Sequence, residues 1–279
     1  MSEALDIVGE PKKIIFKRVV NSGILFALSF ISINFIQNLV SAIIGEFYNL
    51  SPILFFSHVK YTNKIIFNHY SIFINYLSGP FTCLIIAVLS FRFFNALKRT
   101  GGLLKVFFLW LGIIGYVMFF GQFAITLVFP ERHVGSIYNF FDISITYEVI
   151  SILASFSSMA VLGINISKYF MYLSHTRYYI KHSSTRQEFV MQTGILSWIL
   201  GFVLCFLFYI PFHNFFIILM LIFNGIVVGV VYFFSKNKSN KSVHISRNQS
   251  FSKISVKIIY VLVIMWIIFH LTLANGIAI

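Results

Sequence analysis

The sequence predicts an all-α membrane protein with seven transmembrane helices. Of its 279 residues, 58% are hydrophobic and only 10% are charged, whereas a soluble domain carries about 25% charged residues. The chain also contains 35 Phe and 14 Tyr, an aromatic content typical of lipid-facing surfaces and interfacial belts. Most of the chain is therefore expected to face lipid or other helices rather than water.

Apolar stretches set the positions of the expected helices. A helix needs about 20 apolar residues to cross the hydrocarbon core, because lipid offers no hydrogen-bond partner to the backbone. The expected spans cover approximately residues 22–45, 72–94, 103–128, 147–170, 193–210, 213–234 and 256–277. Pro211 ends the fifth span, which forms a tight hairpin with the sixth. We expect a polar, basic cytoplasmic tail over residues 1–21 and a single transmembrane domain over residues 22–279.

The basic residues predict the orientation. Of the 21 Lys and Arg residues, 18 fall in the N-terminal tail and in alternate connections between the spans. The positive-inside rule places these segments in the cytoplasm, so the N-terminus is expected inside and the C-terminus outside. The net charge of +13 is expected to attract anionic lipid, and nucleic acid is not expected as a partner because there is no basic domain to bind it. Compact loops without soluble domains favour the bacterial inner membrane.

The two cysteines do not suggest a metal or a disulfide framework. Cys83 and Cys205 both lie inside apolar stretches, and neither has a second Cys nearby. A zinc ribbon and a structural disulfide are therefore not expected, and no cofactor is predicted.

The first outer connection, residues 46–71, is long enough to hold structure. Residues 53–56, 58–61 and 65–67 are expected to form two short strands around a turn at residues 62–64. Gly79 and Pro80 follow inside the second span, where they loosen the helix and let a neighbouring helix approach closely.

A helix, a strand pair and a second helix carrying Gly-Pro together resemble the core of the site-2 proteases, which are intramembrane zinc metalloproteases. That family carries His-Glu-x-x-His in its first helix, with two zinc ligands and a general base. Here Gln37 stands at the first His, Asn38 at the Glu and Ser41 at the second His. None of these can complete a zinc site, so the resemblance implies a metal-free, inactive relative. Alternatively, these three residues form hydrogen bonds between helices.

Further candidates lie elsewhere in the chain. Glu46, His58 and His133 are expected on the outer side, where they would either share a metal or be ordinary loop residues. His270 is the one His well inside a span, and we expect a neutral ring bonded to an Asn or Ser of a neighbouring helix. Gly225 and Gly229 form a GxxxG motif that favours either packing within the chain or a dimer face.

Three functions remain open. The leading hypothesis is a non-enzymatic scaffold or accessory subunit of an envelope complex. The second is a transporter or permease subunit, in which polar residues surround a central path: Gln37, Asn75, Gln122, Asn165 and His270. The third is an intramembrane metalloprotease-like protein without activity. A cavity lined by polar residues from several helices would favour the second hypothesis over the first.

Overall fold

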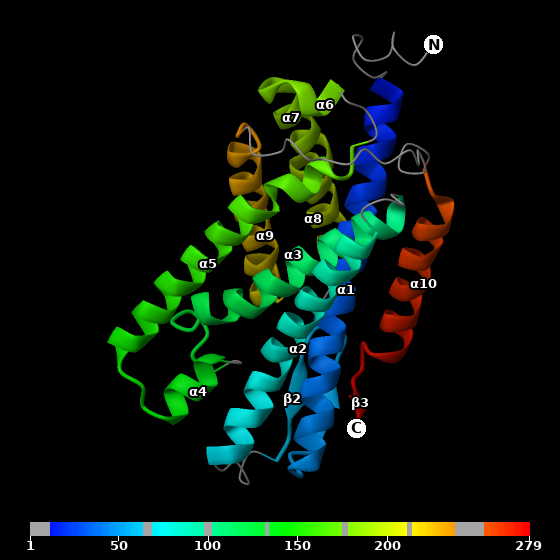
Figure 1. The fold of residues 1–279 in the computed structure, drawn as a ribbon. Coiled ribbons are helices and arrows are strands. Elements are labelled where there is room, and N and C mark those ends of the chain that lie inside the picture. Colours follow the sequence, from blue (N-terminus) through cyan, green and yellow to red (C-terminus); the bar gives the residue numbers. More distant parts are fainter. Residues whose placement is uncertain are drawn as a thin grey trace.

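Helices make up most of the described chain. The computed structural model describes residues 12–63, 69–97, 102–131, 134–174, 178–210, 214–237 and 254–279. The helices are α1 (Lys12–Phe47), α2 (His69–Ala96), α3 (Leu103–Ala124), α4 (Val134–Phe140), α5 (Ile145–Met171), α6 (Tyr178–Lys181), α7 (Ser183–Val190), the π-helix η2 (Met191–Leu196), α8 (Ser197–Phe208), α9 (Phe215–Phe234) and α10 (Val256–Thr272). Figure 1 shows the long helices packed side by side as a bundle.

Six helices in the described ranges are long and apolar enough to cross a membrane. They are α1, α2, α3, α5, α9 and the continuous rod formed by α7, η2 and α8. The helical, apolar architecture predicted from the sequence is therefore confirmed. Two of these helices begin about ten residues before the predicted spans, α1 at Lys12 and the α7–α8 rod at Ser183. The polar tail expected over residues 1–21 is thus helical from Lys12 onwards, and its first eleven residues lie outside the described ranges.

α10 runs in the same direction as α1 but is shorter than the other long helices. It has 17 residues, which is the lower end of the length that spans a bilayer. Its first turn lies beside the start of α1, because the Ser255 amide donates to Asn21 Oδ1 at 3.1 Å. Near its other end, the Phe269 ring packs on Phe35 of α1, with centroids 4.8 Å apart. The predicted seventh span is therefore helical only to Thr272.

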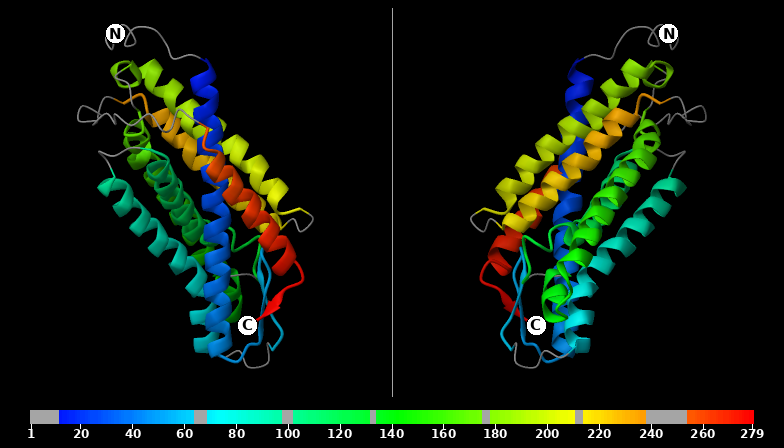
Figure 2. Two further views of the ribbon diagram at one scale, coloured as in Figure 1. Left: turned by 90° about the vertical axis from the view of Figure 1, so that its right-hand side faces the viewer. Right: turned by 90° about the vertical axis from the view of Figure 1, so that its left-hand side faces the viewer.

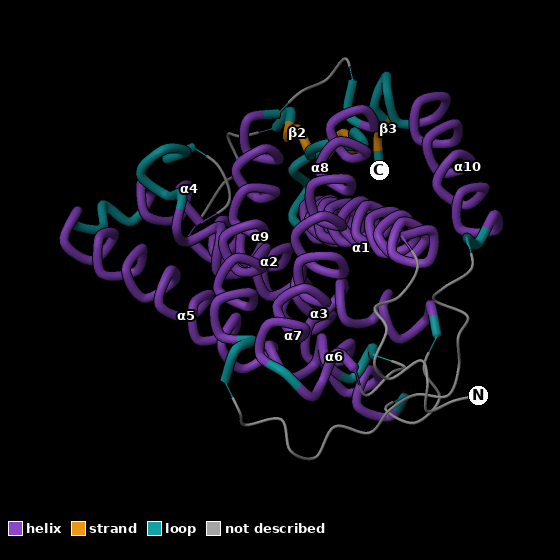
Figure 3. The backbone as a smooth tube through the Cα atoms, turned by 90° about the horizontal axis from the view of Figure 1, so that it is seen from above, coloured by secondary structure: helices purple, strands orange, loops and turns teal. Residues whose placement is uncertain are grey.

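α1 is the central helix of the bundle. Figure 3 looks along α1, which contacts α2, α3, α8 and α10. Gly201 allows α8 to lie close, because a Cβ there would overlap the Phe26 ring and lie 2.9 Å from the Gly23 carbonyl oxygen. α1 is consequently buried on most sides, so its polar residues meet protein rather than lipid.

Three short strands form a sheet at one end of the bundle. β1 (Pro52–Leu54), β2 (Val59–Tyr61) and β3 (Ile277–Ala278) lie in the order β2-β1-β3. β1 pairs antiparallel with both neighbours, and Ile53 lies opposite Lys60 on one side and Ala278 on the other. The last residues of the chain therefore extend a hairpin formed near its beginning.

The predicted position of the hairpin turn was wrong. The turn lies at residues 55–58, where the Phe55 amide donates to the His58 carbonyl at 2.9 Å. Thr62 and Asn63, expected in the turn, follow β2, and residues 64–68 lie outside the described ranges. The reason is packing: the Phe56 ring is buried and stacks on Tyr209 with centroids 5.7 Å apart. Burial of an aromatic side chain outweighs the turn propensity of Thr-Asn-Lys.

The two ends of the bundle differ in charge. We call the end with the sheet the strand end and the end where α1 begins the basic end (Figure 2). Among the described residues, every Lys and Arg except Lys60 lies at the basic end, and the strand end holds Glu46, Glu131, Asp142 and Glu148. This separation agrees with the charge alternation read from the sequence.

Candidate functional site

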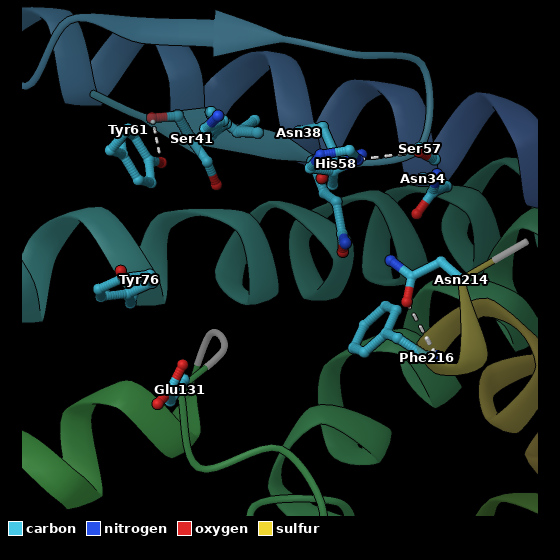
Figure 4. A pocket seen from close by; sticks show the side chains of 13 residues that line it. Asn34, Asn38, Ser41, Ser57, His58, Tyr61, Tyr76, Glu131, Asn214 and Phe216 are labelled. Atoms are coloured by element: carbon cyan, nitrogen blue, oxygen red, sulfur yellow. Dashed lines mark hydrogen bonds between the residues drawn. The ribbon is translucent and has the colours of Figure 1, made fainter. Parts of the chain in front are cut away.

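A polar pocket of about 260 Å³ lies at the strand end. Its walls come from α1, the hairpin of β1 and β2, α2, the segment after α3 and the start of α9 (Figure 4). The lining residues are Asn34, Gln37, Asn38, Ser41, Ser57, His58, Val59, Lys60, Tyr61, Tyr76, Glu131, Asn214 and Phe216. Segments far apart in the sequence therefore meet around one space.

One face of α1 supplies the buried polar wall. Asn34, Gln37, Asn38 and Ser41 follow the i, i+3, i+4, i+7 spacing that places side chains on the same face of a helix. Their exposed fractions are 1%, 1%, 3% and 7%. The structure thus brings the three residues singled out from the sequence to one site and adds Asn34, which the sequence analysis missed. The signal for Asn34 was its position one turn before Gln37.

Hydrogen bonds hold the Gln37 and Asn34 amides from behind. Gln122 Nε2 donates to Gln37 Oε1 at 3.1 Å, and the Cys83 thiol donates to the same oxygen at 3.0 Å. Asn34 Nδ2 donates to the Tyr209 hydroxyl at 2.9 Å. Each amide is therefore fixed through one of its two polar atoms.

Three amide atoms on this face of α1 have no hydrogen-bond partner among the described residues. Within the described residues, Asn34 Oδ1, Gln37 Nε2 and Asn38 Nδ2 are buried without a hydrogen bond. An unsatisfied buried polar group costs about 1–3 kcal/mol, and buried polar atoms in folded proteins normally have a partner. The three side chains that carry these atoms line the pocket. Water or a ligand in the pocket would supply the missing partners.

The close approach of α2 to α1 closes the inner side of the pocket. A Cβ at Gly79 would lie 2.8 Å from Ser41 Oγ and 3.5 Å from the Gln37 carbonyl oxygen. Pro80 is buried at the next position and has no N–H, so the regular helical bond at that turn is absent. The Gly-Pro pair thus lies directly against the α1 residues that line the pocket.

The hairpin forms another wall and contributes Tyr61, His58 and Lys60. The Tyr61 hydroxyl lies 3.2 Å from Asn75 Oδ1 and 3.3 Å from the Ser41 carbonyl oxygen, and it shares its proton between them. Burial raises the pKa of Tyr61 above its usual value, so the hydroxyl stays protonated at neutral pH. His58 is exposed, stacks on Phe55 and lies 3.0 Å from Ser57 Oγ through Nδ1.

A metal site receives no support from the described residues. They contain no group of three His, Cys, Asp or Glu side chains that could hold a metal ion. Of the proposed outer cluster, Glu46 is exposed and does not line the pocket, His58 does line it, and His133 lies outside the described ranges. Gln37, Asn38 and Ser41 offer neutral amides and a hydroxyl, which are poor zinc ligands.

Two residues expected on a central path lie elsewhere. Asn165 is exposed on the outside of α5. His270 Nδ1 lies 3.0 Å from the Trp266 carbonyl oxygen and Nε2 lies 2.9 Å from that of Ile210. The predicted Asn or Ser partner for His270 was therefore wrong, because the ring bridges two backbone carbonyls at the ends of α8 and α10. Asn75 and Gln122 do belong to the network around the pocket.

Only the first glycine of the GxxxG motif in α9 packs against another helix among the described residues. A Cβ at Gly225 would overlap the Trp198 ring of α8, whereas Gly229 faces open space. Gly225 thus serves packing between α9 and α8. A dimer face would have only Gly229 of the pair available.

Comparison of the chain with protein-family models, with curated protein sequences and with solved structures gives no match. The chemistry of the pocket therefore carries the functional argument.

Proposed function

We propose that the chain is a seven-pass protein of the bacterial inner membrane, with the basic end in the cytoplasm and the strand end outside. The separation of Lys and Arg from the strand end supports this orientation. The parallel course of α10 and α1 supports an odd number of crossings. The cations of the basic end would contact anionic lipid head groups.

The function that fits the pocket best is non-enzymatic binding of a small polar ligand that enters from the strand end. One observation carries this proposal: three buried amides beside the pocket each hold an unpaired polar atom. Such atoms destabilise an empty site and stabilise an occupied one, because the ligand supplies the missing hydrogen bonds. A receptor-like or accessory subunit of an envelope complex would use the pocket in this way.

A protein that serves only as a scaffold needs no internal polar cavity. The pocket therefore favours a ligand-binding protein over a scaffold. A through-membrane permease is the second candidate, favoured by Gln37, Asn75 and Gln122 in one network. Asn165 and His270 do not join them. The pocket at one end therefore supports capture of a ligand more directly than its passage.

The resemblance to site-2 proteases gives the same pocket an evolutionary interpretation. The residues at the metal-binding and general-base positions, Gln37, Asn38 and Ser41, line the pocket. We propose a metal-free relative in which amides took over a former catalytic face as a binding surface. Such a protein would not hydrolyse peptides, because these side chains supply neither a Lewis acid nor a base.

Thiol labelling from each side of the membrane tests the proposal. Asn38→Cys places a thiol in the pocket, and Ser29→Cys places one on the same helix away from it, where Ser29 is fully buried. Cys83 and Cys205 are buried and give the background. A membrane-impermeant maleimide should label Asn38→Cys in right-side-out vesicles and not in inverted ones, and should leave Ser29→Cys unlabelled.

Other labelling patterns would assign other functions. Labelling of Asn38→Cys from both sides would favour the permease, because the site would then open alternately to each side. Protection from both sides would mean a dry pocket and would favour the scaffold. A periplasm-dependent reporter fused after Ile279 tests the number of crossings: activity outside agrees with seven, and activity only inside contradicts it.

A further inference from the structure

The buried lining of the pocket carries no formal charge. The deeply buried residues contribute amides, hydroxyls and aromatic rings: Asn34, Gln37, Asn38, Ser41, Ser57, Tyr61 and Phe216. The Lys, Glu and His residues of the lining, Lys60, Glu131 and His58, are all exposed. An ion that left water for this interior would meet no opposite charge and would lose much of its hydration free energy.

The unpaired atoms include both donors and an acceptor. Gln37 Nε2 and Asn38 Nδ2 donate, and Asn34 Oδ1 accepts. A carboxylate only accepts and would leave Asn34 Oδ1 unpaired, whereas an ammonium only donates and would leave both nitrogens unpaired. An amide or a hydroxyl does both, so it can satisfy all three atoms.

The size and the walls of the pocket limit the ligand further. A volume of about 260 Å³ holds roughly nine waters at about 30 Å³ each and lies below the range of about 300–1,000 Å³ for drug-sized ligands. Tyr61, Tyr76 and Phe216 supply ring surfaces that can cover aliphatic carbon. A compact molecule of about eight heavy atoms fits this space.

We propose that the pocket takes a small neutral molecule bearing amide or hydroxyl groups and discriminates against charged molecules of the same shape. This inference rests on the proposed ligand-binding function and adds the class of ligand. Discrimination arises because buried amides reject a group that cannot pair with them, and the buried part of the lining offers a charged analogue no counter-ion. Lys60 and Glu131 also line the pocket, but their side chains are exposed to water, which weakens any pairing with a buried ligand.

Three compounds of nearly equal size test the charge preference. N-acetylglycinamide is neutral, N-acetylglycine is an anion at neutral pH, and N-acetylethylenediamine is a cation. Their dissociation constants would be measured by ligand-observed NMR on the full chain in nanodiscs prepared without glycerol. Erythritol, a neutral polyol, tests whether hydroxyl groups can replace amides. The neutral diamide should bind at least about tenfold more tightly than either ion.

Matched variants connect binding to the pocket. Asn38→Leu and Gln37→Leu should each weaken binding of N-acetylglycinamide by about tenfold or more. Ser29→Ala, on the same helix outside the pocket, should bind as the wild type does. Thermal unfolding of each variant reports whether it is folded.

Two outcomes would overturn the inference. If either ion bound as tightly as the neutral diamide, the ligand class would be wrong while the ligand-binding function stood. If none of the four compounds bound, the assigned class would also be wrong. Labelling of Asn38→Cys would then decide separately whether the pocket is open and the proposed function survives.

Discussion

α1 carries buried polar side chains in two places, and the two places differ in how those side chains are partnered. Near its start, Arg18 and Ser22 bond to Gln192 and Thr193 of η2. We call these four residues, together with the buried Arg186 of the preceding helix α7, the basic-end cluster. There Arg18 Nη1 donates to Gln192 Oε1 at 3.0 Å, and the guanidinium lies over the Tyr179 and Phe189 rings. About five turns further along α1, the pocket amides keep unpaired atoms next to an open space.

The comparison distinguishes buried polar residues that stabilise the fold from buried polar residues that can bind a ligand. In the basic-end cluster, Ser22 Oγ donates to the Thr193 carbonyl at 2.9 Å and accepts from Trp110 Nε1 at 3.0 Å. The adjacent π-helix η2 places Gln192 and Thr193 against α1. Substitutions there should therefore reduce stability, whereas substitutions of Asn38 and Ser41 at the pocket should leave stability nearly unchanged.

Arg186→Met should have the largest effect. The Arg186 guanidinium donates to the carbonyl oxygens of Ser235, Lys236 and Ile180 at 3.0, 2.7 and 2.9 Å, and Met keeps the aliphatic stem without a donor. Loss of three charge-assisted bonds should lower the free energy of unfolding by about 3 kcal/mol. Denaturant unfolding in detergent measures this change, and a loss below about 1 kcal/mol would show that these bonds hold little of the fold.

Gln192→Leu should lower the free energy of unfolding by about 2 kcal/mol, because it removes the acceptor of a fully buried guanidinium. Gln192→Glu keeps an acceptor for Arg18 but replaces the amide that donates to Glu188 Oε1 at 3.2 Å with a second carboxylate, so it should recover only part of the stability that Gln192→Leu loses. Equal losses in both variants would show that side-chain shape, rather than the bond to Arg18, matters at residue 192.

Two serines on α1 compare the regions directly. Ser22→Ala removes an acceptor from the Trp110 indole and a donor from the Thr193 carbonyl, and it should cost about 1–2 kcal/mol. Among the described residues, Ser41 Oγ has a single weak hydrogen-bond contact, 3.5 Å from Ser78 Oγ, so Ser41→Ala should change stability by less than about 0.5 kcal/mol. Similar losses at both positions in the same unfolding assay would remove the distinction between the two regions.

Asn38→Leu should leave stability unchanged or raise it by up to about 1 kcal/mol. The substitution removes a buried amide nitrogen that has no partner among the described residues, and removal of such a group relieves its desolvation cost. The same variant should lose binding of the neutral diamide. A clear loss of stability would instead mean that Asn38 supports the fold.

The sequence predicted the helices well because hydropathy and length control them. The expected fourth span, residues 147–170, corresponds to α5 at Ile145–Met171. Hydropathy cannot show where a helix continues beyond its apolar part, so the early starts at Lys12 and Ser183 were missed. It also cannot distinguish the last apolar residues of a helix from a short strand, so the expected seventh span continued past the end of α10 at Thr272 to Ile277, the first residue of β3.

The pocket was predictable only in part. Gln37, Asn38 and Ser41 drew attention through their spacing in one helix, and Asn34 lies on the same face. Tyr61, Asn214 and Phe216 could not be assigned to the site, because only tertiary packing brings the hairpin and the start of α9 to α1. Asn165 was expected to line a central path, but its side chain is exposed on the outside of α5. The sequence of an apolar helix does not show which of its faces points into the bundle.

If the pocket binds a polar ligand, the unpaired amide atoms of α1 should have partners that are not part of the protein. A cryo-electron-microscopy map of the protein in nanodiscs, at a resolution that shows ordered water, tests it most directly. The account predicts non-protein density within about 3.2 Å of Asn34 Oδ1, Gln37 Nε2 and Asn38 Nδ2. A pocket closed by direct bonds among these amides, with no density between them, would contradict it.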